Sequence, residues 1–173
     1  QSGKTEDLKA YIEQYRMTLP PDTARTWCEN YAVNTVISYY GEEARKASVD
    51  FSVRIQLPPS LPLGEPQLCS IFGNLLENAI EASEKVPEDT RMVKVYSKIT
   101  NGNLLLTVRN HWDGELPFSG ETVYSTKHEG AGIGLSSVRS LVKKNGGQFF
   151  LKPEKHEFEV SVVLWNAADK VKH

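Results

Sequence analysis

The segment 65–85 constrains the fold more than any other part of the sequence, because its apolar residues keep a helical period throughout. They recur at i, i+4, i+7, i+8 and i+11, and they are Leu68, Phe72, Leu75, Leu76 and Ala79. A helix with one apolar face must be covered by another layer of structure. An alternating strand pattern at 49–57 precedes this segment, and strand patterns at 91–100 and 103–109 follow it. The helix is therefore expected to pack on a sheet.

The remaining elements extend this layered pattern. Further helices are expected at 5–17, 30–47 and 132–145, and closing strands at 148–152 and 157–165. Asn101-Gly102 separates two apolar runs, which is typical of a tight β-hairpin turn. Residues 110–131 lack periodicity and are expected to form a long loop, and loops of this length in compact domains are usually functional or disordered. The order predicts an α/β (α+β) two-layer sandwich, in which helices cover one face of a mixed sheet.

Composition and charge narrow the classes of function. A chain of 173 residues with a formal net charge of −2 has the size of one domain and lacks the concentrated basic surface of nucleic-acid-binding proteins. No apolar run is long enough to span a membrane, and Cys28 and Cys69 show neither metal-ligand spacing nor a disulfide pattern. The opening Gln1-Ser2 resembles the scar of a cleaved tag, so we expect an excised piece of a larger protein.

A glycine-rich motif lies before the helix at 132–145, and it reads Gly130-Ala131-Gly132-Ile133-Gly134-Leu135. Glycines permit positive φ and a close approach of the backbone to a ligand, and a following helix points its free N–H groups at the same place. Together these features are typical of a phosphate site, although a merely structural turn is the alternative. The upstream Lys127 could reach phosphates held there, or it could be a solvated loop charge.

The position of this motif excludes two common phosphate loops. A dinucleotide-binding fingerprint follows a first strand and carries an acidic residue about twenty positions later. A P-loop ends in Gly-Lys followed by Ser or Thr. The motif at 130–135 instead follows a long loop near the end of the chain.

A second motif lies on the helix at 65–85, where Asn74, Asn78 and Glu81 follow at i, i+4 and i+7. They share one face of the helix, opposite the apolar stripe. Asparagine is a mediocre helix former, because its amide competes for backbone hydrogen bonds. Two asparagines one turn apart therefore indicate a function, such as contact with a ligand or a hydrated Mg²⁺, which prefers oxygen donors. A solvated polar face is the alternative.

The two motifs together resemble those of the GHKL, or Bergerat-fold, ATPases. The Asn74–Asn78 helix is similar to the N box of that superfamily, and the glycines from Gly130 to Gly134 are similar to its second glycine box. With Ser125-Thr126-Lys127, the chain looks most like the histidine-kinase branch, and within it like peptide-sensing quorum kinases with a degenerate first glycine box. The resemblance covers residues 28–165. It implies an ATP-binding catalytic domain, with the end of a dimerisation helix and a connector at 1–27 and a tail at 166–173.

The resemblance also assigns roles to individual residues. Asn78 matches the residue that coordinates Mg²⁺ through its side-chain oxygen, and Asn74 lies one turn earlier on the nucleotide face. The backbone of Gly132, Gly134 and Leu135 matches the segment that wraps the phosphates of ATP. Lys127 matches a lysine of the lid, which would extend over residues 114–129.

The adenine contact departs from the family pattern. The first glycine box normally places an Asp after a strand, and its carboxylate accepts a hydrogen bond from the adenine amino group. Here Asn110 falls at that place, and its amide can both accept and donate. Asp113, next to Gly114, is the competing candidate by a shifted alignment. His111 and Trp112 in the same stretch are read as packing residues or as part of a solvent-exposed loop.

The N box favours phosphotransfer over hydrolysis. Hydrolases of the superfamily carry a Glu one turn before the Mg²⁺-binding Asn, and here that position is Asn74, whose amide cannot act as a general base. Loss of a general base lowers a rate by about 10²–10⁴-fold. Glu77 lies about 60° round the helix and cannot replace it. The resemblance therefore implies transfer of the γ-phosphate of ATP to a histidine.

None of the four histidines, His111, His128, His156 and His173, lies in the first hundred residues. The acceptor histidine is therefore expected on a dimerisation hairpin outside this chain. The resemblance implies a homodimeric parent protein, a response regulator as partner, and the cytoplasmic domain of a membrane-anchored bacterial sensor. The alternatives are a nucleotide-binding regulatory module without transferase activity and a serine kinase of the anti-sigma-factor type.

Overall fold

The computed structural model describes residues 7, 10, 11, 14, 26–114 and 131–167. The predicted helix at 5–17 is covered only by its four described residues, which are helical. Most of the predicted lid, with Lys127 and Gly130, lies outside the described residues. The elements are α2 (Tyr31–Lys46), β1 (Asp50–Gln56), α3 (Glu65–Ser83), the 3₁₀ turn η1 (Glu88–Thr90), β2 (Met92–Thr100), β3 (Asn103–His111), α4 (Ala131–Lys144), β4 (Gln148–Pro153) and β5 (Glu157–Leu164).

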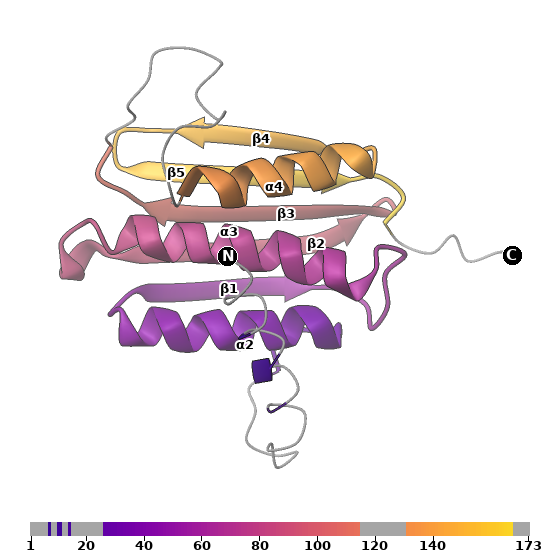
Figure 1. Ribbon diagram of the computed structural model, residues 1–173, viewed down its shortest axis with the longest axis horizontal. Coiled ribbons are helices and arrows are strands. Elements are labelled where there is room, and N and C mark those ends of the chain that lie inside the picture. The colour runs from indigo at the N-terminus through magenta and orange to yellow at the C-terminus, as the bar shows by residue number, and fades with distance from the viewer. Residues whose placement is uncertain (1–6, 8–9, 12–13, 15–25, 115–130, 168–173) are drawn as a thin grey trace, which may run out of the picture.

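The strands form one mixed sheet of five strands in the order β1-β2-β3-β5-β4 (Figure 1). β1 and β2 pair in parallel, and α3 is the crossover that connects them. The other pairs, β2 with β3, β3 with β5 and β4 with β5, are antiparallel. This topology makes α3 run in the direction of β3, whereas α4 runs against β3 and begins at the end of the sheet where β3 ends (Figure 1). The predicted mixed sheet is confirmed.

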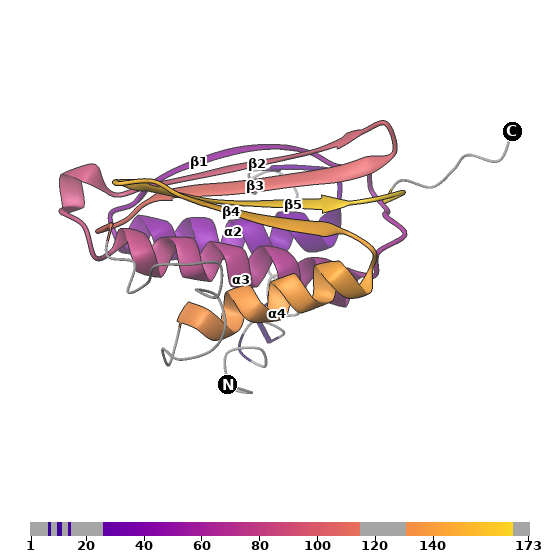
Figure 2. The ribbon, with the colours of Figure 1, turned by 90° about the horizontal axis from the view of Figure 1, so that it is seen from above.

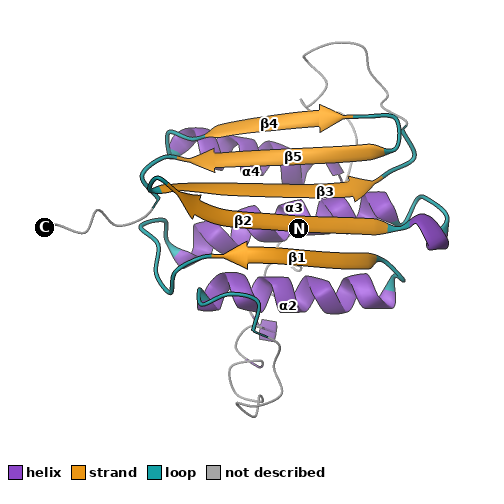
Figure 3. Ribbon diagram, turned by 180° about the vertical axis from the view of Figure 1, so that it is seen from behind, coloured by secondary structure: helices purple, strands orange, loops and turns teal. Residues whose placement is uncertain are grey.

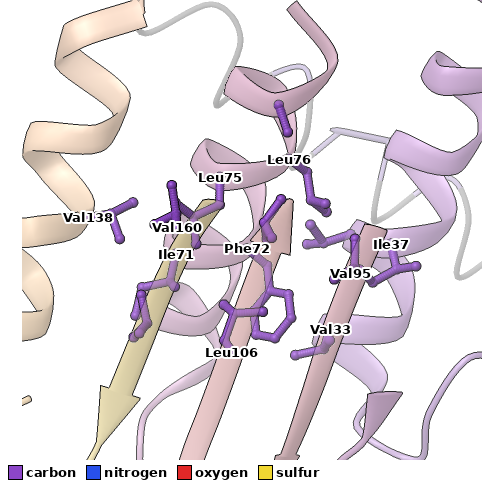
Figure 4. Packing of buried hydrophobic residues seen from close by; sticks show 14 of the residues in the cluster. Val33, Ile37, Ile71, Phe72, Leu75, Leu76, Val95, Leu106, Val138 and Val160 are labelled. Carbon is purple, nitrogen blue, oxygen red and sulfur yellow. The ribbon is translucent and has the colours of Figure 1, made fainter. Parts of the chain in front are cut away.

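The helices α2, α3 and α4 lie side by side on one face of the sheet, as the view from above shows (Figure 2). The opposite face carries no helix of the described chain (Figure 3). The core lies between these two layers, and Phe72 points from α3 to the sheet beside Leu106 of β3 (Figure 4). Both side chains are fully buried. The apolar stripe read from the sequence is therefore the core face of α3.

The β2–β3 turn has the backbone expected of its residues. Asn101 and Gly102 have φ values of 52° and 77°, so both central residues are left-handed, as in a type I′ turn. This turn fixes a register in which Thr100 faces Asn103 and Val93 faces Asn110. The hairpin predicted from Asn-Gly is confirmed, and its register places Asn110 in the eighth residue pair counted from the turn.

Arg91 ties α2 and α3 together near their C-terminal ends. Its guanidinium donates to the Ala47 carbonyl at 2.7 Å, to the Glu84 carbonyl at 3.1 Å and to the Val86 carbonyl at 3.2 Å. The last carbonyls of a helix have no intrahelical partner, so a cation that binds them there stabilises the helix end. One side chain thus links the C-cap residue of α2 to the segment that follows α3.

Candidate functional site

The two asparagines of the sequence motif lie near the middle of α3, half-buried rather than solvated. The Asn78 side-chain oxygen is buried and has no hydrogen-bond partner among the described residues. A buried acceptor left without a donor costs about 1–3 kcal/mol. The free Asn78 oxygen is therefore available to a donor or a cation that comes from outside the protein. This argues against a merely solvated polar face.

Asn74 lies against the first turns of α4. A Cβ added at Gly134 would lie 3.4 Å from the Asn74 side-chain oxygen and 3.7 Å from the Asn74 Cβ. A Cβ at Gly134 would thus be in van der Waals contact with Asn74, which shows how closely α4 passes α3 at this point. The sequence motifs at 74–78 and 130–135 are far apart in the chain, and the structure brings them together here.

The glycine motif forms part of a helix, which corrects one expectation. We expected these glycines to turn the backbone with positive φ, but Gly132 and Gly134 both lie within α4, which begins at Ala131. Gly134 has no positive φ. The N–H groups of the first helical turn have no intrahelical acceptor, and within α4 these groups belong to Ala131, Gly132 and Ile133. The amides thus remain suited to an anion, but the glycines serve close packing and helix entry rather than a turn.

The side chain of Leu135 belongs to the core. Its side chain is 7% exposed and packs with Val138 and Val142, which anchors α4 to the sheet. Its contribution to the site is therefore to hold the first turn of α4 in place.

Asn110 lies within β3, one residue before its end, rather than in a loop that follows the strand. It pairs with Val93 of β2 and with Phe158 of β5, and its side chain is 2% exposed. Every second residue of β3 is buried, and Asn110 follows Leu104, Leu106 and Val108 in this series. Its side chain therefore projects to the helix side of the sheet, as theirs do. The amide nitrogen donates to the His111 carbonyl at 2.9 Å, which leaves the amide oxygen as the acceptor for another donor.

The residues after Asn110 are held by the β4–β5 turn. The Trp112 indole donates to the Glu154 carbonyl at 2.7 Å and its ring lies 5.3 Å from that of Phe158, so the packing interpretation of Trp112 is confirmed. His111 contacts the Thr90 carbonyl at 2.5 Å. Gly114 has a φ of 75°, and a Cβ there would lie 2.5 Å from the Lys155 carbonyl oxygen. Asp113 is exposed and lies beyond β3, away from the buried row that contains Asn110.

The other side of α3 has a different chemistry. Glu77 and Glu81 line a hollow of about 200 Å³ between α2 and α3, together with Tyr39, Tyr40, Glu43, Ile80, Glu84 and Asp7. Burial raises the pKa of Tyr40, and the charge of Glu77 raises it further, so its phenol stays protonated. By its spacing in the sequence, Glu81 shares a helical face with the asparagines. In the structure it lines this carboxylate-rich hollow instead.

The sequence reading missed Ser70, which contacts the Asn74 side chain through both its carbonyl and its hydroxyl. A small hydroxyl residue four positions before an asparagine in a helix was the available signal, because side chains at i and i+4 meet.

Comparison with known proteins identifies the architecture first. The catalytic domain of the histidine kinase ThkA, solved in a nucleotide-free form, superposes with a TM-score of 0.65 at 20% sequence identity, covering 81% of this chain and 94% of that chain. The five-stranded mixed sheet with helices on one face is thus the fold of a histidine kinase catalytic domain.

Sequence comparison then identifies the family. The model of the GHKL domain family matches residues 65–165, and the chain belongs to this family. Sensor histidine kinase NatK of Bacillus subtilis (strain 168) is 30% identical over 79% of this chain and 45% of its own length. Sensor protein TdiS of Thauera aromatica is 27% identical over 69% of this chain and 23% of its own length. The chain therefore spans less than half the length of these curated relatives.

Proposed function

We propose that this chain is the ATP-binding catalytic domain of a two-component sensor histidine kinase, with the domain extending over residues 28–165. It binds ATP with Mg²⁺ and transfers the γ-phosphate to a histidine on a dimerisation hairpin. The observation that carries the proposal is the buried Asn78 oxygen without a partner, on the helix that contacts the glycine motif of α4. Both motifs lie on elements of the matched family region.

The residues present fit a hydrated Mg²⁺. Mg²⁺ takes oxygen ligands and usually keeps several waters, so one or two protein oxygens are sufficient. The Asn78 oxygen is unpaired, and the Asn74 oxygen has no donor among the described residues, whereas its amide nitrogen is engaged. Asn78 would hold the ion directly, with Asn74 beside it. When bound, Mg²⁺ neutralises charge on the phosphates.

The chain's own groups then position the nucleotide. The free N–H groups at the start of α4 bind phosphate oxygens, because they lie at the positive end of the helix dipole. Within the same proposal, the Asn110 oxygen accepts from the adenine amino group, Lys127 approaches the terminal phosphate, and the backbone of Gly130 continues the phosphate loop. Asn110 is preferred to Asp113 because it projects from β3 to the helix layer. Positioning and electrostatics supply most of the catalysis in phosphoryl transfer.

The site lacks a base at the place where a hydrolase needs one. The Asn74 amide cannot take a proton from water, and Glu77 lies on the side of α3 that faces α2. We therefore expect slow hydrolysis, which preserves the γ-phosphate for transfer to a protein side chain.

The acceptor histidine is proposed to belong to another segment of the parent protein. His111 is part of β3, where its ring contacts Thr90 and Glu157, so it cannot approach a nucleotide on the helix layer. The parent protein would act as a homodimer and pass the phosphoryl group to a response regulator. Membrane anchoring is part of the same proposal; within the described residues, no helix is long and apolar enough to cross a membrane.

The test is phosphotransfer in trans from radiolabelled ATP to a separately supplied acceptor hairpin of a sensor kinase. Label on the hairpin that depends on Mg²⁺ and is lost with Asn78→Ala supports the proposal. Nucleotide binding without any transfer to a histidine would instead indicate a regulatory nucleotide-binding module. Acid-stable label on a serine would indicate a serine kinase.

A thermal-shift titration with ATP, ADP and GTP separates binding from transfer. A ligand at a hundred times its dissociation constant adds about 2.7 kcal/mol to the free energy of unfolding. In a domain of this size, each kcal/mol raises the thermal midpoint by about 2–4 °C. We expect a rise of several degrees with adenine nucleotides only, and a smaller rise for Asn78→Ala.

A further inference from the structure

Asn74 is held in one orientation by the residue one turn before it. Its amide nitrogen donates to the Ser70 carbonyl at 2.7 Å and lies 3.3 Å from the Ser70 hydroxyl oxygen. The carbonyl is only an acceptor, so the amide end that faces it must be the nitrogen. The reversed amide would place two acceptor oxygens against each other at the same distance.

This orientation decides what Asn74 offers to a ligand. The amide nitrogen faces Ser70, so the oxygen points away from Ser70, to the place where α4 passes at Gly134. No described residue donates to that oxygen. One turn later, the buried Asn78 oxygen is likewise without a donor. Two amide oxygens that are one turn apart on one helix are therefore both kept free to accept.

A second asparagine in the chain shows what the hydroxyl adds. The Asn145 amide nitrogen donates to the Leu141 carbonyl at 2.8 Å, also four residues earlier. Residue 141 has no hydroxyl, so the second N–H of Asn145 has no such acceptor. Asn145 is also exposed, at the end of α4 and far along the helix from Gly134. The Asn74 amide therefore differs from an ordinary asparagine of this kind by the contact with the Ser70 hydroxyl.

We propose that Ser70 is a positioning residue: its carbonyl sets the direction of the Asn74 amide and its hydroxyl secures it, so that the Asn74 oxygen accepts from the hydration water of Mg²⁺ instead of the nitrogen donating to phosphate. This inference rests on the proposed function for the identity of the ion, but not for the orientation of the amide. Ser70 itself touches no ligand. Its effect is transmitted through Asn74, and it sets the response of the site to Mg²⁺ rather than the affinity for the nucleotide alone.

The first experiment measures the amide orientation without nucleotide. Side-chain amide resonances of Asn74 are compared by NMR in the unchanged chain, Ser70→Ala and Ser70→Thr. Ser38→Ala is the control for loss of a helix hydroxyl elsewhere, because Ser38 lies on α2 and its hydroxyl donates to the Asn34 carbonyl at 2.8 Å. We expect one Asn74 amide proton to shift and exchange faster with water in Ser70→Ala, approaching the behaviour of Asn145. Ser70→Thr and Ser38→Ala leave it unchanged. Identical Asn74 resonances in all variants overturn the proposal.

The second experiment measures ATP affinity with and without Mg²⁺ by calorimetry. In Ser70→Ala, the affinity for ATP alone stays within about twofold, and the enhancement by Mg²⁺ falls by about two- to fivefold, the lower part of the range expected for one neutral hydrogen bond. Ser70→Thr restores the enhancement, since its hydroxyl can occupy the same place. Equal losses with and without Mg²⁺ indicate a general structural role and overturn the proposal.

The two experiments separate the two possible failures. If the unchanged chain binds no ATP, the proposed function fails and the Mg²⁺ part of this inference fails with it. The amide resonances still decide whether Ser70 orients Asn74. If ATP binds and the resonances do not respond to Ser70→Ala, the proposed function stands and the positioning role is wrong.

Discussion

The side of α3 that faces α4 and the side that faces α2 differ in their polar groups and in how these groups are paired. On one side of Asn74, helical geometry places Asn78 about 40° away, and on the other side it places Glu77 about 60° away. The first side meets α4 across a glycine and keeps a buried oxygen without a partner. The second side meets α2, where Arg91 links the helix ends with three hydrogen bonds and carboxylates surround a hollow.

This difference separates ligand binding from stability. Within the described part of the chain, the side that faces α4 presents two asparagine amides and leaves the Asn78 oxygen unsatisfied, which costs stability and favours a ligand. The side that faces α2 carries negative charge, which would repel phosphates, and its contacts are completed within the fold. Substitutions on the first side should therefore change binding more than stability, and substitutions on the second side should do the reverse.

The largest expected effect is that of Asn78→Leu on the side that faces α4. Removal of one group aimed at the charge of a reacting phosphate lowers phosphotransfer by about 100-fold. Without nucleotide, the same change replaces an unsatisfied buried oxygen by an apolar group, so the free energy of unfolding stays equal or rises by about 1 kcal/mol. Transfer to an acceptor hairpin and thermal denaturation measure the two quantities. A variant that loses stability without nucleotide contradicts the comparison.

Arg91→Ala tests the side that faces α2. The change removes three hydrogen bonds to helix-end carbonyls and lowers the free energy of unfolding by about 2 kcal/mol. Urea denaturation measures this loss, and ATP affinity of the folded protein should stay within about twofold. In Arg91→Lys, a single ammonium cannot reach all three carbonyls, so less than half of the loss is recovered. A larger change in ATP affinity than in stability would show that the two sides are coupled.

A smaller effect is expected from Gly134→Ala. The added Cβ would lie 3.4 Å from the Asn74 oxygen, in van der Waals contact with it, so the methyl group partly covers that oxygen and ATP affinity falls by about fivefold. Alanine favours a helix over glycine by about 1 kcal/mol, so stability without ligand does not fall. Calorimetry and thermal denaturation measure both.

Gly147→Ala is the matched control for that glycine. A Cβ there would collide with the Val163 carbonyl and lie 2.8 Å from a Leu164 methyl group. We expect it to lower the free energy of unfolding by about 1–3 kcal/mol through overpacking. Its effect on ATP affinity should be small, and the reverse pattern for the two glycines would refute their assignment.

The smallest expected effect concerns Tyr40 in the α2–α3 hollow. Burial raises the pKa of Tyr40 in the folded state above its ordinary value of 10.0. Above about pH 10 the unfolded chain loses the phenol proton while the folded chain keeps it, so this group makes stability fall as pH rises. Tyr40→Phe should show a shallower fall from pH 10 to 11, by up to about 1 kcal/mol, and little difference in slope at pH 8. Equal slopes in urea denaturation would contradict the burial effect.

The sequence predicts most of the fold because local chemistry and packing agree along it. The stripe of Leu68, Phe72 and Leu76 on α3 becomes the core face, and the left-handed turn at Asn101-Gly102 fixes the β2–β3 register. The parallel pairing of β1 with β2 follows from the helix between them, since parallel neighbours need a crossover. The strand order, by contrast, places β5 inside β4, which depends on packing that residue periodicity does not encode.

The site is less accessible to sequence reasoning, because it depends on contacts between distant segments. Glycines at alternate positions indicate a turn or a close helix contact equally well, and only the proximity of Asn74 to Gly134 decides between them. Asn110 looks like a loop residue after an apolar strand, yet pairing with Val93 and Phe158 extends β3 beyond it. Glu81 shares the helical spacing of the asparagines, but in the structure it lines the hollow between α2 and α3.

The turn at Asn101 and Gly102 also divides the candidate site between two halves of the chain. The first half contains α3 with Asn74 and Asn78, and the second contains Asn110 and α4. The turn lies at the end of the sheet opposite to Asn110, so cleavage there leaves the site itself intact. Each half alone would expose an unpaired strand edge, and a ligand that contacts both would stabilise only the reassembled pair. The β2–β3 turn is thus a suitable split site for a fragment-complementation reporter. In such a reporter, the nucleotide concentration would determine the fraction of fragments that associate.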